Sequence, residues 1–463
     1  MLLPVLALAQ NNPNSPSSYG WTWMGGSSTA NQAGIYGTLG QPAAANVPGA
    51  RSQAVTVTDK YGNLWLFGGD GYDSAGISGN LGDLWKFNTA TTAPNQWTWV
   101  SGSNLTDHTL GAIPGVYGTK GVAAPANNPG TRDAAVGWAD HAGNLWIFGG
   151  YGLDTNGKWG LYDDLWEFNT ATNLWTWVSG SNTIGDQGGL SGIYGTGADY
   201  PGSRVWAQAW TDQNSNLWLF GGYGADGVGN GGLLNDLWEF NTFTKQWLWV
   251  SGSKKANQPG VYGNYRPSAG IPGARSQAVT VTDEYGNLWL FGGQGYDSAG
   301  ISGNLGDLWK LDTTSGQWTW VSGSDVTDHT LGALPANYGL QGTASISNNP
   351  GTRDAAIGWS DSNGKFWLFG GYGIDPTGTW GFYNDLWKFD PSTDQWTWMS
   401  GDDTMSSFGG HAGVYGGVGA HPGSRIWAGS WTDNNGHIWL FGGYGFDGLG
   451  NGSGGLLNDL WRN

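Results

Sequence analysis

Leu64-Trp-Leu-Phe-Gly-Gly69 is a short apolar run that ends in two glycines. Its Phe-Gly-Gly core returns five more times along the 463 residues, with successive spacings of 81, 72, 71, 78 and 72. Each copy is surrounded by the same parts in the same order: Pro-Gly-x-Arg, an apolar run, Phe-Gly-Gly, Asp-Leu-Trp and Trp-x-Trp. Self-similarity at such a period indicates a repeat architecture.

The conserved order of parts predicts four β-strands in each repeat. The runs are four to eight residues long, rich in Val, Thr, Trp and Phe, and bounded by turn residues, as in residues 51–58, 64–67, 83–87 and 96–100. Four strands in each of six repeats predict an all-β protein, a six-bladed β-propeller. The double glycine supplies the backbone freedom for a sharp turn near the ring centre. Of the 32 tryptophans, 24 fall on the common template and are expected to fill the wedges between blades.

The two ends of the repeat array complement each other. The sixth repeat stops at Asp459–Asn463 without its last strand, whereas Tyr19–Met24 is a Trp-x-Trp strand with no strands before it. We therefore expect the N-terminal strand to complete the last blade, within one domain of residues 19–463. Residues 51–86 and 275–310 differ at only two positions, Lys60/Glu284 and Asp70/Gln294, so blades 1–3 are repeated as blades 4–6 with pseudo-twofold symmetry.

The N-terminus favours export. Residues 1–9 contain a short apolar run and the small-x-small pattern Ala7-Leu8-Ala9, which predicts a signal peptide whose basic front is missing. Residues 10–18 are then a linker. A merely apolar start is the alternative. The expected location is secreted, cell-surface or periplasmic.

Composition excludes several classes of function. With 18 basic and 35 acidic residues the net charge is −17, so neither nucleic acid nor an anionic membrane is an expected partner. No internal apolar stretch is long enough for a transmembrane segment. The absence of cysteine excludes disulfides, zinc–thiolate sites and thiol catalysis. We expect a monomer.

These residues resemble the kelch-repeat propellers, whose blades carry a double glycine after an apolar strand and a spaced Tyr/Phe and Trp downstream. The repeats here are longer than the family norm, which implies added loops. The central domain of galactose oxidase is similar, but its copper site needs a Tyr–Cys cross-link and this chain has no cysteine. The Glu-x₃-Asp-x₃-His run of the iron-dependent specifier proteins is also missing. Sialic-acid epimerases resemble the chain in blade number and export, without a residue-by-residue match to a catalytic set.

The candidate binding surface is the face that carries the long loops, over the central channel. Six of only eight arginines begin the innermost strands, and the two positions after each arginine vary from blade to blade. The candidate ligand-binding residues are Arg51, Arg132, Arg204, Arg275, Arg353, Arg425, Gln53, Gln277, Asp133, Asp354, Trp206, Trp427, Trp159 and Trp380. Indole faces stack on sugar rings, and amide or carboxylate groups bind hydroxyls. The alternative is that these residues pack within the blades.

Two further motifs carry weaker signals. A repeated loop aspartate is expected to fix the loop by side-chain to backbone hydrogen bonds, with calcium binding as the alternative; its copies are Asp73, Asp154, Asp226, Asp297, Asp375 and Asp447. The duplicated dipeptides Asp107-His108 and Asp328-His329 are interpreted as solvated loop residues, because no nucleophile or third metal ligand accompanies them. We expect no catalytic residue, no metal site and no cofactor.

The sequence thus favours an exported, non-catalytic binding or scaffold propeller that engages a carbohydrate or protein ligand on its loop-rich face. A glycan-active enzyme, such as a sugar epimerase that uses Asp and His on the same face, is the alternative. A structural cell-surface module is a third class. Fold analogy alone does not separate them.

Overall fold

The structure is a computed structural model that describes residues 20–89, 96–109, 114–185, 189–263, 268–283, 286–329, 335–406, 409–450 and 454–463. In this part of the chain it contains 37 β-strands and no helix. The predicted all-β class is confirmed. The expected signal peptide and linker lie outside the described residues. We number the repeats 1 to 6 by their Phe-Gly-Gly segments.

Repeats 1 and 4 each form one sheet. The strands of repeat 1 are β2 (Arg51–Ser52), β3 (Val55–Thr58), β4 (Leu64–Tyr72), β5 (Ser78–Phe87) and β6 (Trp97–Ser101). The strands of repeat 4 are β21 (Ser268–Gly270), β22 (Arg275–Ser276), β23 (Val279–Thr282), β24 (Leu288–Tyr296), β25 (Ser302–Asp312) and β26 (Gln317–Ser322). All pairings are antiparallel, and β2 and β3 pair with successive parts of β4.

Repeats 2, 3 and 5 each divide into a four-stranded and a three-stranded sheet. The strands of repeat 2 are β7 (Arg132–Asp133), β8 (Val136–Ala139), β9 (Leu145–Phe148), β10 (Tyr151–Leu153), β11 (Trp159–Leu161), β12 (Leu165–Asn169) and β13 (Leu174–Ser179). Those of repeat 3 are β14 (Arg204–Val205), β15 (Gln208–Thr211), β16 (Leu217–Phe220), β17 (Tyr223–Ala225), β18 (Gly231–Leu233), β19 (Leu237–Asn241) and β20 (Gln246–Ser251). Those of repeat 5 are β27 (Arg353–Asp354), β28 (Ile357–Ser360), β29 (Phe366–Phe369), β30 (Tyr372–Ile374), β31 (Trp380–Phe382), β32 (Leu386–Asp390) and β33 (Gln395–Ser400).

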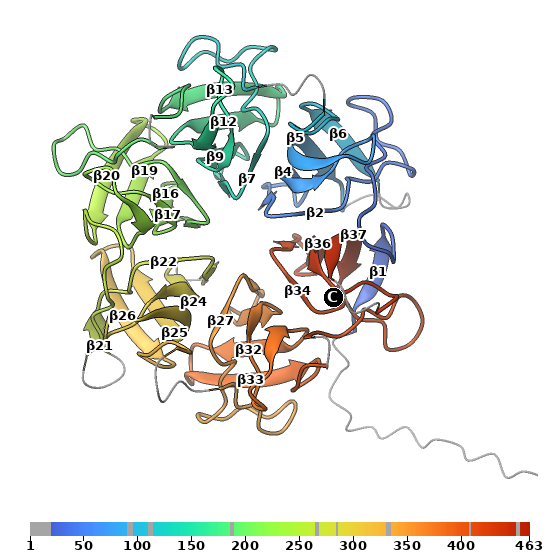
Figure 1. The fold of residues 1–463 in the computed structure, drawn as a ribbon, viewed down its shortest axis with the longest axis vertical. Coiled ribbons are helices and arrows are strands. Elements are labelled where there is room, and N and C mark those ends of the chain that lie inside the picture. The colour runs from blue at the N-terminus through green and yellow to red at the C-terminus, as the bar shows by residue number, and fades with distance from the viewer. Residues whose placement is uncertain are drawn as a thin grey trace, which may run out of the picture.

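The first described strand lies beside the last. The strands of repeat 6 are β34 (Arg425–Ile426), β35 (Gly429–Thr432), β36 (Ile438–Gly445) and β37 (Gly455–Arg462). β1 (Thr22–Gly25) pairs antiparallel with β37, with Trp23 opposite Trp461. Figure 1 shows the sheets arranged radially about a central axis, with β2, β7, β22, β27 and β34 nearest to it. The fold is therefore β-propeller-like, and the predicted pairing of the terminal strands is present.

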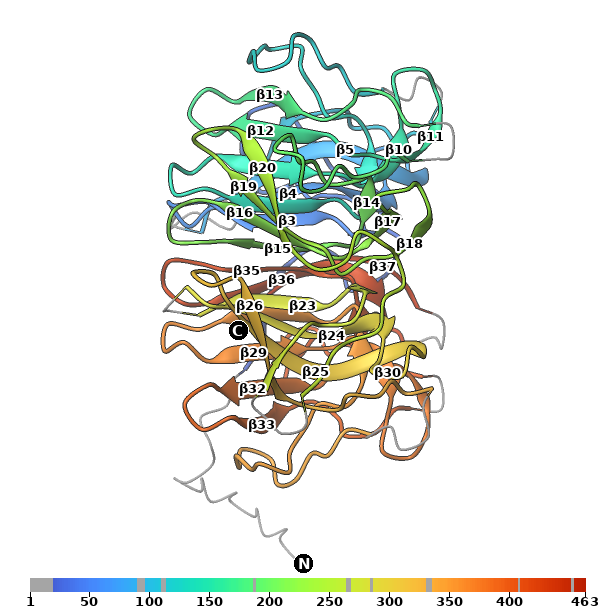
Figure 2. The same ribbon diagram turned by 90° about the vertical axis from the view of Figure 1, so that its left-hand side faces the viewer.

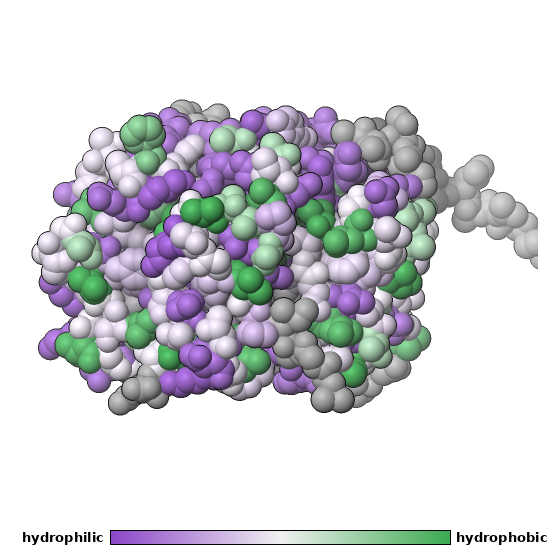
Figure 3. Space-filling model, turned by 90° about the horizontal axis from the view of Figure 1, so that it is seen from above, coloured by the Kyte–Doolittle hydropathy of each residue, from purple (hydrophilic) through white to green (hydrophobic). Residues whose placement is uncertain are grey.

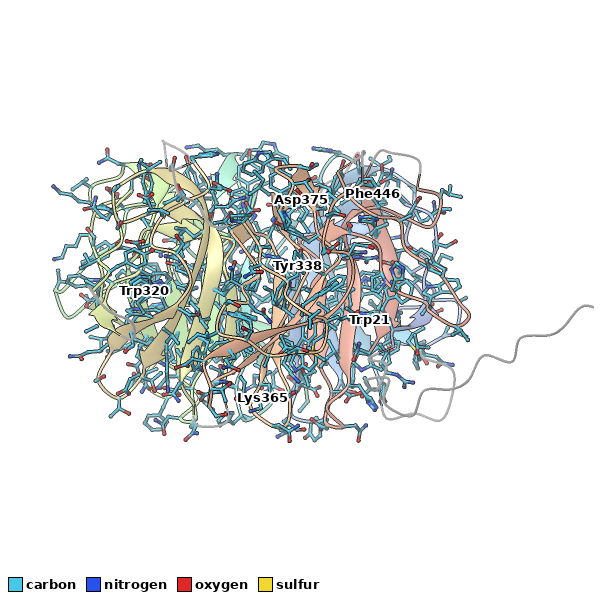
Figure 4. The ribbon with its side chains drawn as sticks, turned by 90° about the horizontal axis from the view of Figure 1, so that it is seen from below. Trp21, Trp320, Tyr338, Lys365, Asp375 and Phe446 are labelled. Atoms are coloured by element: carbon cyan, nitrogen blue, oxygen red, sulfur yellow. The ribbon has the colours of Figure 1, made fainter. Side chains whose placement is uncertain are left out.

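The two faces of the molecule differ in their connections. Tight turns lie at one end of the sheets, and the small sheets that contain β10, β11, β17, β18 and β30 lie toward the other (Figure 2). In Figure 4, Asp375 and Phe446 lie near one edge of the molecule and Lys365, in a tight turn, lies near the opposite edge. We call the end that carries Asp375 and the long connections the loop-rich face.

A ring of backbone hydrogen bonds surrounds the central axis. One residue in each innermost strand has a φ between 52° and 58° and donates its amide to the carbonyl of its equivalent one repeat earlier, at 3.0–3.2 Å. The ring residues are Gln53, Ala134, Trp206, Gln277, Ala355 and Trp427, and Gln53 donates to Trp427, so the cycle closes. A left-handed conformation costs a non-glycine residue about 1–3 kcal/mol, which the surrounding structure must offset. The kink divides each innermost strand into two short parts.

The double glycine forms a bulge rather than the predicted sharp turn that ends the second strand: β4 continues through Gly68 and Gly69, and its register against β5 shifts between Phe67 and Gly69. Gly68 and Gly69 have φ values of +63° and +96°, and a Cβ on Gly69 would lie 2.5 Å from the carbonyl oxygen of Ser52. Only glycine fits so close to the innermost strand without displacing it. The second strand can therefore approach the ring of hydrogen bonds.

Indoles fill the spaces between repeats, as the sequence predicts. One core cluster joins Trp65 and Phe67 of repeat 1 to Trp166, Phe168 and Trp175 of repeat 2. The Trp65 and Phe168 rings lie 5.6 Å apart in an edge-on arrangement. Burial of such rings stabilises the contact between neighbouring repeats.

Candidate functional site

The six repeated arginines lie inside the repeats. Each is at most 1% exposed and forms a two-point ion pair with an aspartate of its own repeat; Arg51, for example, lies 2.6 and 2.8 Å from the two oxygens of Asp83. The pairs are Arg51–Asp83, Arg132–Asp164, Arg204–Asp236, Arg275–Asp307, Arg353–Asp385 and Arg425–Asp459. The hydroxyl of Tyr36 and the indole of Trp85 donate to the same carboxylate, Asp83. This placement agrees with the packing alternative, so we leave the arginines out of the binding surface.

The repeated loop aspartates also have a structural role. Asp154 accepts hydrogen bonds from the amides of Asn156 and Lys158 at one oxygen and from the amide of Ile184 at the other. Burial alone would raise its pKa, but these hydrogen bonds outweigh burial and lower it. The side chain therefore fixes its own loop and the connection to the next repeat. The predicted side-chain to backbone hydrogen bonds are confirmed in all six copies.

Gln53, Gln277, Trp206 and Trp427 occupy the axial ring. The indole nitrogen of Trp206 donates to the side-chain oxygen of Gln53 at 3.2 Å, and that of Trp427 donates to Gln277 at 3.1 Å. All four residues are partly exposed. A cavity of about 490 Å³ on the other side of the ring is lined by the second parts of the innermost strands. The structure thus brings the predicted amides and indoles together as two pairs.

Asp133 and Trp159 belong to one small sheet in repeat 2. Asp133 on β7 lies opposite Tyr151 on β10, which places the two side chains on one face of the sheet. The Tyr151 and Trp159 rings stack with centroids 5.7 Å apart and an interplanar angle of 26°. Trp159 is 37% exposed, so one surface of this aromatic pair is free to meet a ligand.

The connection from repeat 1 to repeat 2 adds two more groups. The amide of Asn80 donates to Asp107 at 2.9 Å, and the side chain of Asp107 is fully buried. His108 donates from Nδ1 to the carbonyl of Ser78, and its ring lies 6.2 Å from that of Trp159. The His108 side chain is 61% exposed, which agrees with the prediction of a solvated histidine. The buried state of Asp107 does not agree with it, because the carboxyl group is anchored to β5.

Two buried carboxylate oxygens beside this sheet have no hydrogen-bond partner. They are Oδ2 of Asp107 and Oδ1 of Asp133. Burial, followed by the charges of Asp70 and Asp107, raises the pKa of Asp133 to about 7. Burial also raises the pKa values of Asp70 and Asp107. The carboxyl groups therefore hold a proton more readily than free aspartate does, because close like charges oppose full ionisation.

The same arrangement recurs in repeats 4 and 5. Asp354 lies opposite Tyr372, and the Tyr372 and Trp380 rings are 5.7 Å apart. Oδ2 of Asp328 and Oδ1 of Asp354 are again buried and unpartnered. Burial and the charge of Asp328 raise the pKa of Asp354 to about 7. Trp380 is 38% exposed.

We therefore define two aromatic–acidic sites on the loop-rich face. The first aromatic–acidic site consists of Asp70, Asp107, His108, Asp133, Tyr151 and Trp159. The second aromatic–acidic site consists of Gln294, Asp328, His329, Asp354, Tyr372 and Trp380. Asp70 and Gln294 occupy equivalent positions opposite Ser52 and Ser276.

Sequence reasoning missed part of each site. Tyr151, Tyr372 and Asp70 directly follow the double glycine, where the residue type varies between repeats. The variation at the position after the double glycine could have identified these residues, because a position with only a structural role is expected to keep one residue type. The unpartnered oxygens of Asp107 and Asp328 depend on long-range packing and leave no local pattern.

The part of the chain that the structure describes shows neither a metal-ligand cluster nor a membrane-spanning helix. There, no three His, Cys, Asp or Glu side chains converge as metal ligands. Nor does this part hold a helix long and apolar enough to span a membrane. The side of the ring visible in Figure 3 mixes hydrophilic and hydrophobic residues.

Comparison with known proteins supports the fold. No family model matches the chain, and no curated protein matches it. Among solved structures, 300 chains match. One of them, entitled "Structure of YjhT", has 15% sequence identity and a TM-score of 0.52 over 89% of this chain and 95% of that chain. At this identity the likeness shows the fold alone, which is all-β and β-propeller-like.

Proposed function

We propose that the chain is an exported, six-bladed kelch-type propeller that binds carbohydrate on its loop-rich face. The closed cycle of six hydrogen-bonded ring residues and the pairing of β1 with β37 support six blades closed by the N-terminal strand. The resemblance of the repeats to kelch blades supports the family. The apolar segment at residues 1–9 supports export.

One observation carries the binding proposal: an exposed indole, stacked on a tyrosine and flanked by carboxyl groups, occurs twice on the same face. Trp159 and Trp380 each present an aromatic surface beside Asp133 and Asp354, respectively. Sugar rings have apolar faces that pack on aromatic rings, and their hydroxyls bind carboxyl groups. The same features suit a peptide ligand less well, because the aromatic surface is a small platform beside polar groups rather than an apolar groove.

A glycan-active enzyme, such as a sugar epimerase, is the second candidate. It is favoured by the carboxyl group of Asp133, whose pKa of about 7 suits proton transfer near neutral pH. The exposed ring of His108 lies beside the same aromatic pair. This candidate needs turnover of a bound sugar, whereas the binding proposal needs affinity alone.

The test is a glycan and peptide array, followed by titration of the best ligand into the wild type and a Trp159→Ala/Trp380→Ala variant. We expect glycan binding by the wild type and at least a tenfold loss in the variant, which corresponds to about 1.4 kcal/mol of lost contact with the indole. Phe243→Ala is the matched control, because Phe243 is an aromatic residue, 94% exposed, in a turn on the opposite face. Equal glycan affinity of all three proteins would refute the proposal, and conversion of the bound sugar would favour the enzyme.

A further inference from the structure

The two aromatic–acidic sites differ by one carboxyl group. Residues 51–86 and 275–310 contain two differences, and Asp70/Gln294 is the one that falls in a site. The backbone positions are equivalent, because Asp70 lies opposite Ser52 and Asn80 just as Gln294 lies opposite Ser276 and Asn304. The substitution therefore changes charge at a fixed place in the fold.

The first site contains more negative charge than its surroundings neutralise. Asn80, opposite Asp70, links the three carboxyl groups: its amide donates to Asp107, and its side chain donates to the carbonyl of Tyr151, opposite Asp133. The charge of Asp70 contributes to the raised pKa values of Asp107 and Asp133. Among the described residues, no lysine or arginine forms an ion pair with any of them, and the exposed ring of His108 lies 3.9 Å from Asp107. The fully buried side chain of Asp107 also keeps one oxygen without a partner. A ligand that brings a positive charge would relieve this imbalance.

We propose that Asp70 makes the first aromatic–acidic site selective for a cationic amino sugar, whereas the second site, with Gln294, takes neutral sugars. This inference rests on the proposed carbohydrate binding and specifies its substrate class. A protonated amine would form charge-assisted hydrogen bonds with the carboxylates, which are about twice as strong as neutral ones. The same cation would lie beside the Tyr151–Trp159 pair, whose ring faces attract positive charge.

The second site lacks that preference for a physical reason. The amide of Gln294 carries no charge and offers both a donor and an acceptor to sugar hydroxyls. The second site contains two carboxyl groups, Asp328 and Asp354, and the charge of Asp328 raises the pKa of Asp354. When Asp354 takes up a proton, one negative charge remains. A neutral sugar then meets a protonated carboxyl, an amide and an aromatic face.

The experiment titrates the tetrasaccharides of glucosamine and N-acetylglucosamine into full-length protein at a pH of about 6, where the amine is protonated. The variants are Asp70→Gln, which copies the second site into the first, and Gln294→Asp, which does the reverse. Each places a residue that the chain already carries in equivalent surroundings, so both are expected to fold. We expect one high-affinity glucosamine site in the wild type, about tenfold weaker binding in Asp70→Gln, and two high-affinity sites in Gln294→Asp.

The outcomes separate this inference from the proposal on which it rests. Binding of both tetrasaccharides with affinities that neither variant changes overturns the selectivity and leaves carbohydrate binding intact. If the wild type binds neither tetrasaccharide and no other glycan of the array, carbohydrate binding fails and the selectivity with it. Binding of glucosamine that Trp159→Ala leaves unchanged overturns the placement of the cation at this site.

Discussion

Two partly buried carboxyl groups make the folded protein sensitive to pH. The pKa values of Asp133 and Asp354 are raised to about 7, mainly by burial. The unfolded chain releases these protons near pH 4, whereas the folded chain keeps them until about pH 7. Between these values the folded state binds more protons than the unfolded state, so the free energy of unfolding falls as pH rises and levels off above the folded pKa.

The expected effect is a lower melting temperature at about pH 8 than at about pH 5, equivalent to a few kcal/mol for both groups together. An Asp133→Asn/Asp354→Asn variant carries neutral amides at both positions and should lose most of this difference. Asp403→Asn, at an exposed position, is the control. Melting followed by circular dichroism across this range checks the prediction, and identical pH profiles for the wild type and the double variant would contradict it.

At the residue scale, the sequence identified candidate site residues better than it identified the side chains with which they interact. It located Asp133 from the variation that follows the repeated arginine and Trp159 as a tryptophan outside the common template, and the structure places both in one small sheet. It did not predict that Arg132 pairs with Asp164, because the two are 32 positions apart and meet only when the repeat folds. The left-handed conformation of Trp206 was equally hidden, since indole side chains have no local preference for it.

At the element scale, β1 is the strand whose pairing depends on the longest sequence separation. Trp21, just before β1, packs against Phe369 with ring centroids 5.6 Å apart and joins a core cluster with Trp461. The equivalent indole in repeat 1 is Trp97, which contacts Phe87 of its own repeat and Phe441 of repeat 6. The end-matching pattern in the sequence was sufficient to predict this strand, because the missing Trp-x-Trp of repeat 6 stands at the other terminus.

Trp21→Ala should destabilise the protein as much as Trp97→Ala does, by about 3–5 kcal/mol each, because both remove a buried indole from a junction between repeats. Chemical denaturation of the two variants and the wild type measures the comparison. A negligible effect of Trp21→Ala beside a large effect of Trp97→Ala would mean that β1 is not an integral strand of the fold.

At the scale of the whole molecule, the internal duplication produces two copies of the aromatic–acidic site. The two aromatic–acidic sites have the same sheet register, the same aromatic pair and the same unpartnered oxygens. The repeat pattern predicted this symmetry, whereas the chemistry of each site arises where a connection from one repeat meets the small sheet of the next. That meeting joins residues from separate repeats, so it could not be read from any single motif.

The central claim is that the loop-rich face carries two sugar-binding sites, and calorimetric counting of bound ligand tests it most directly. With one amino sugar and one neutral glycan titrated separately, the wild type should bind one molecule of each. Trp159→Ala should lose the amino sugar, Trp380→Ala should lose the neutral glycan, and the double variant should bind neither at the same concentrations. Binding of both glycans that survives in the double variant, with folding intact by circular dichroism, would contradict the account.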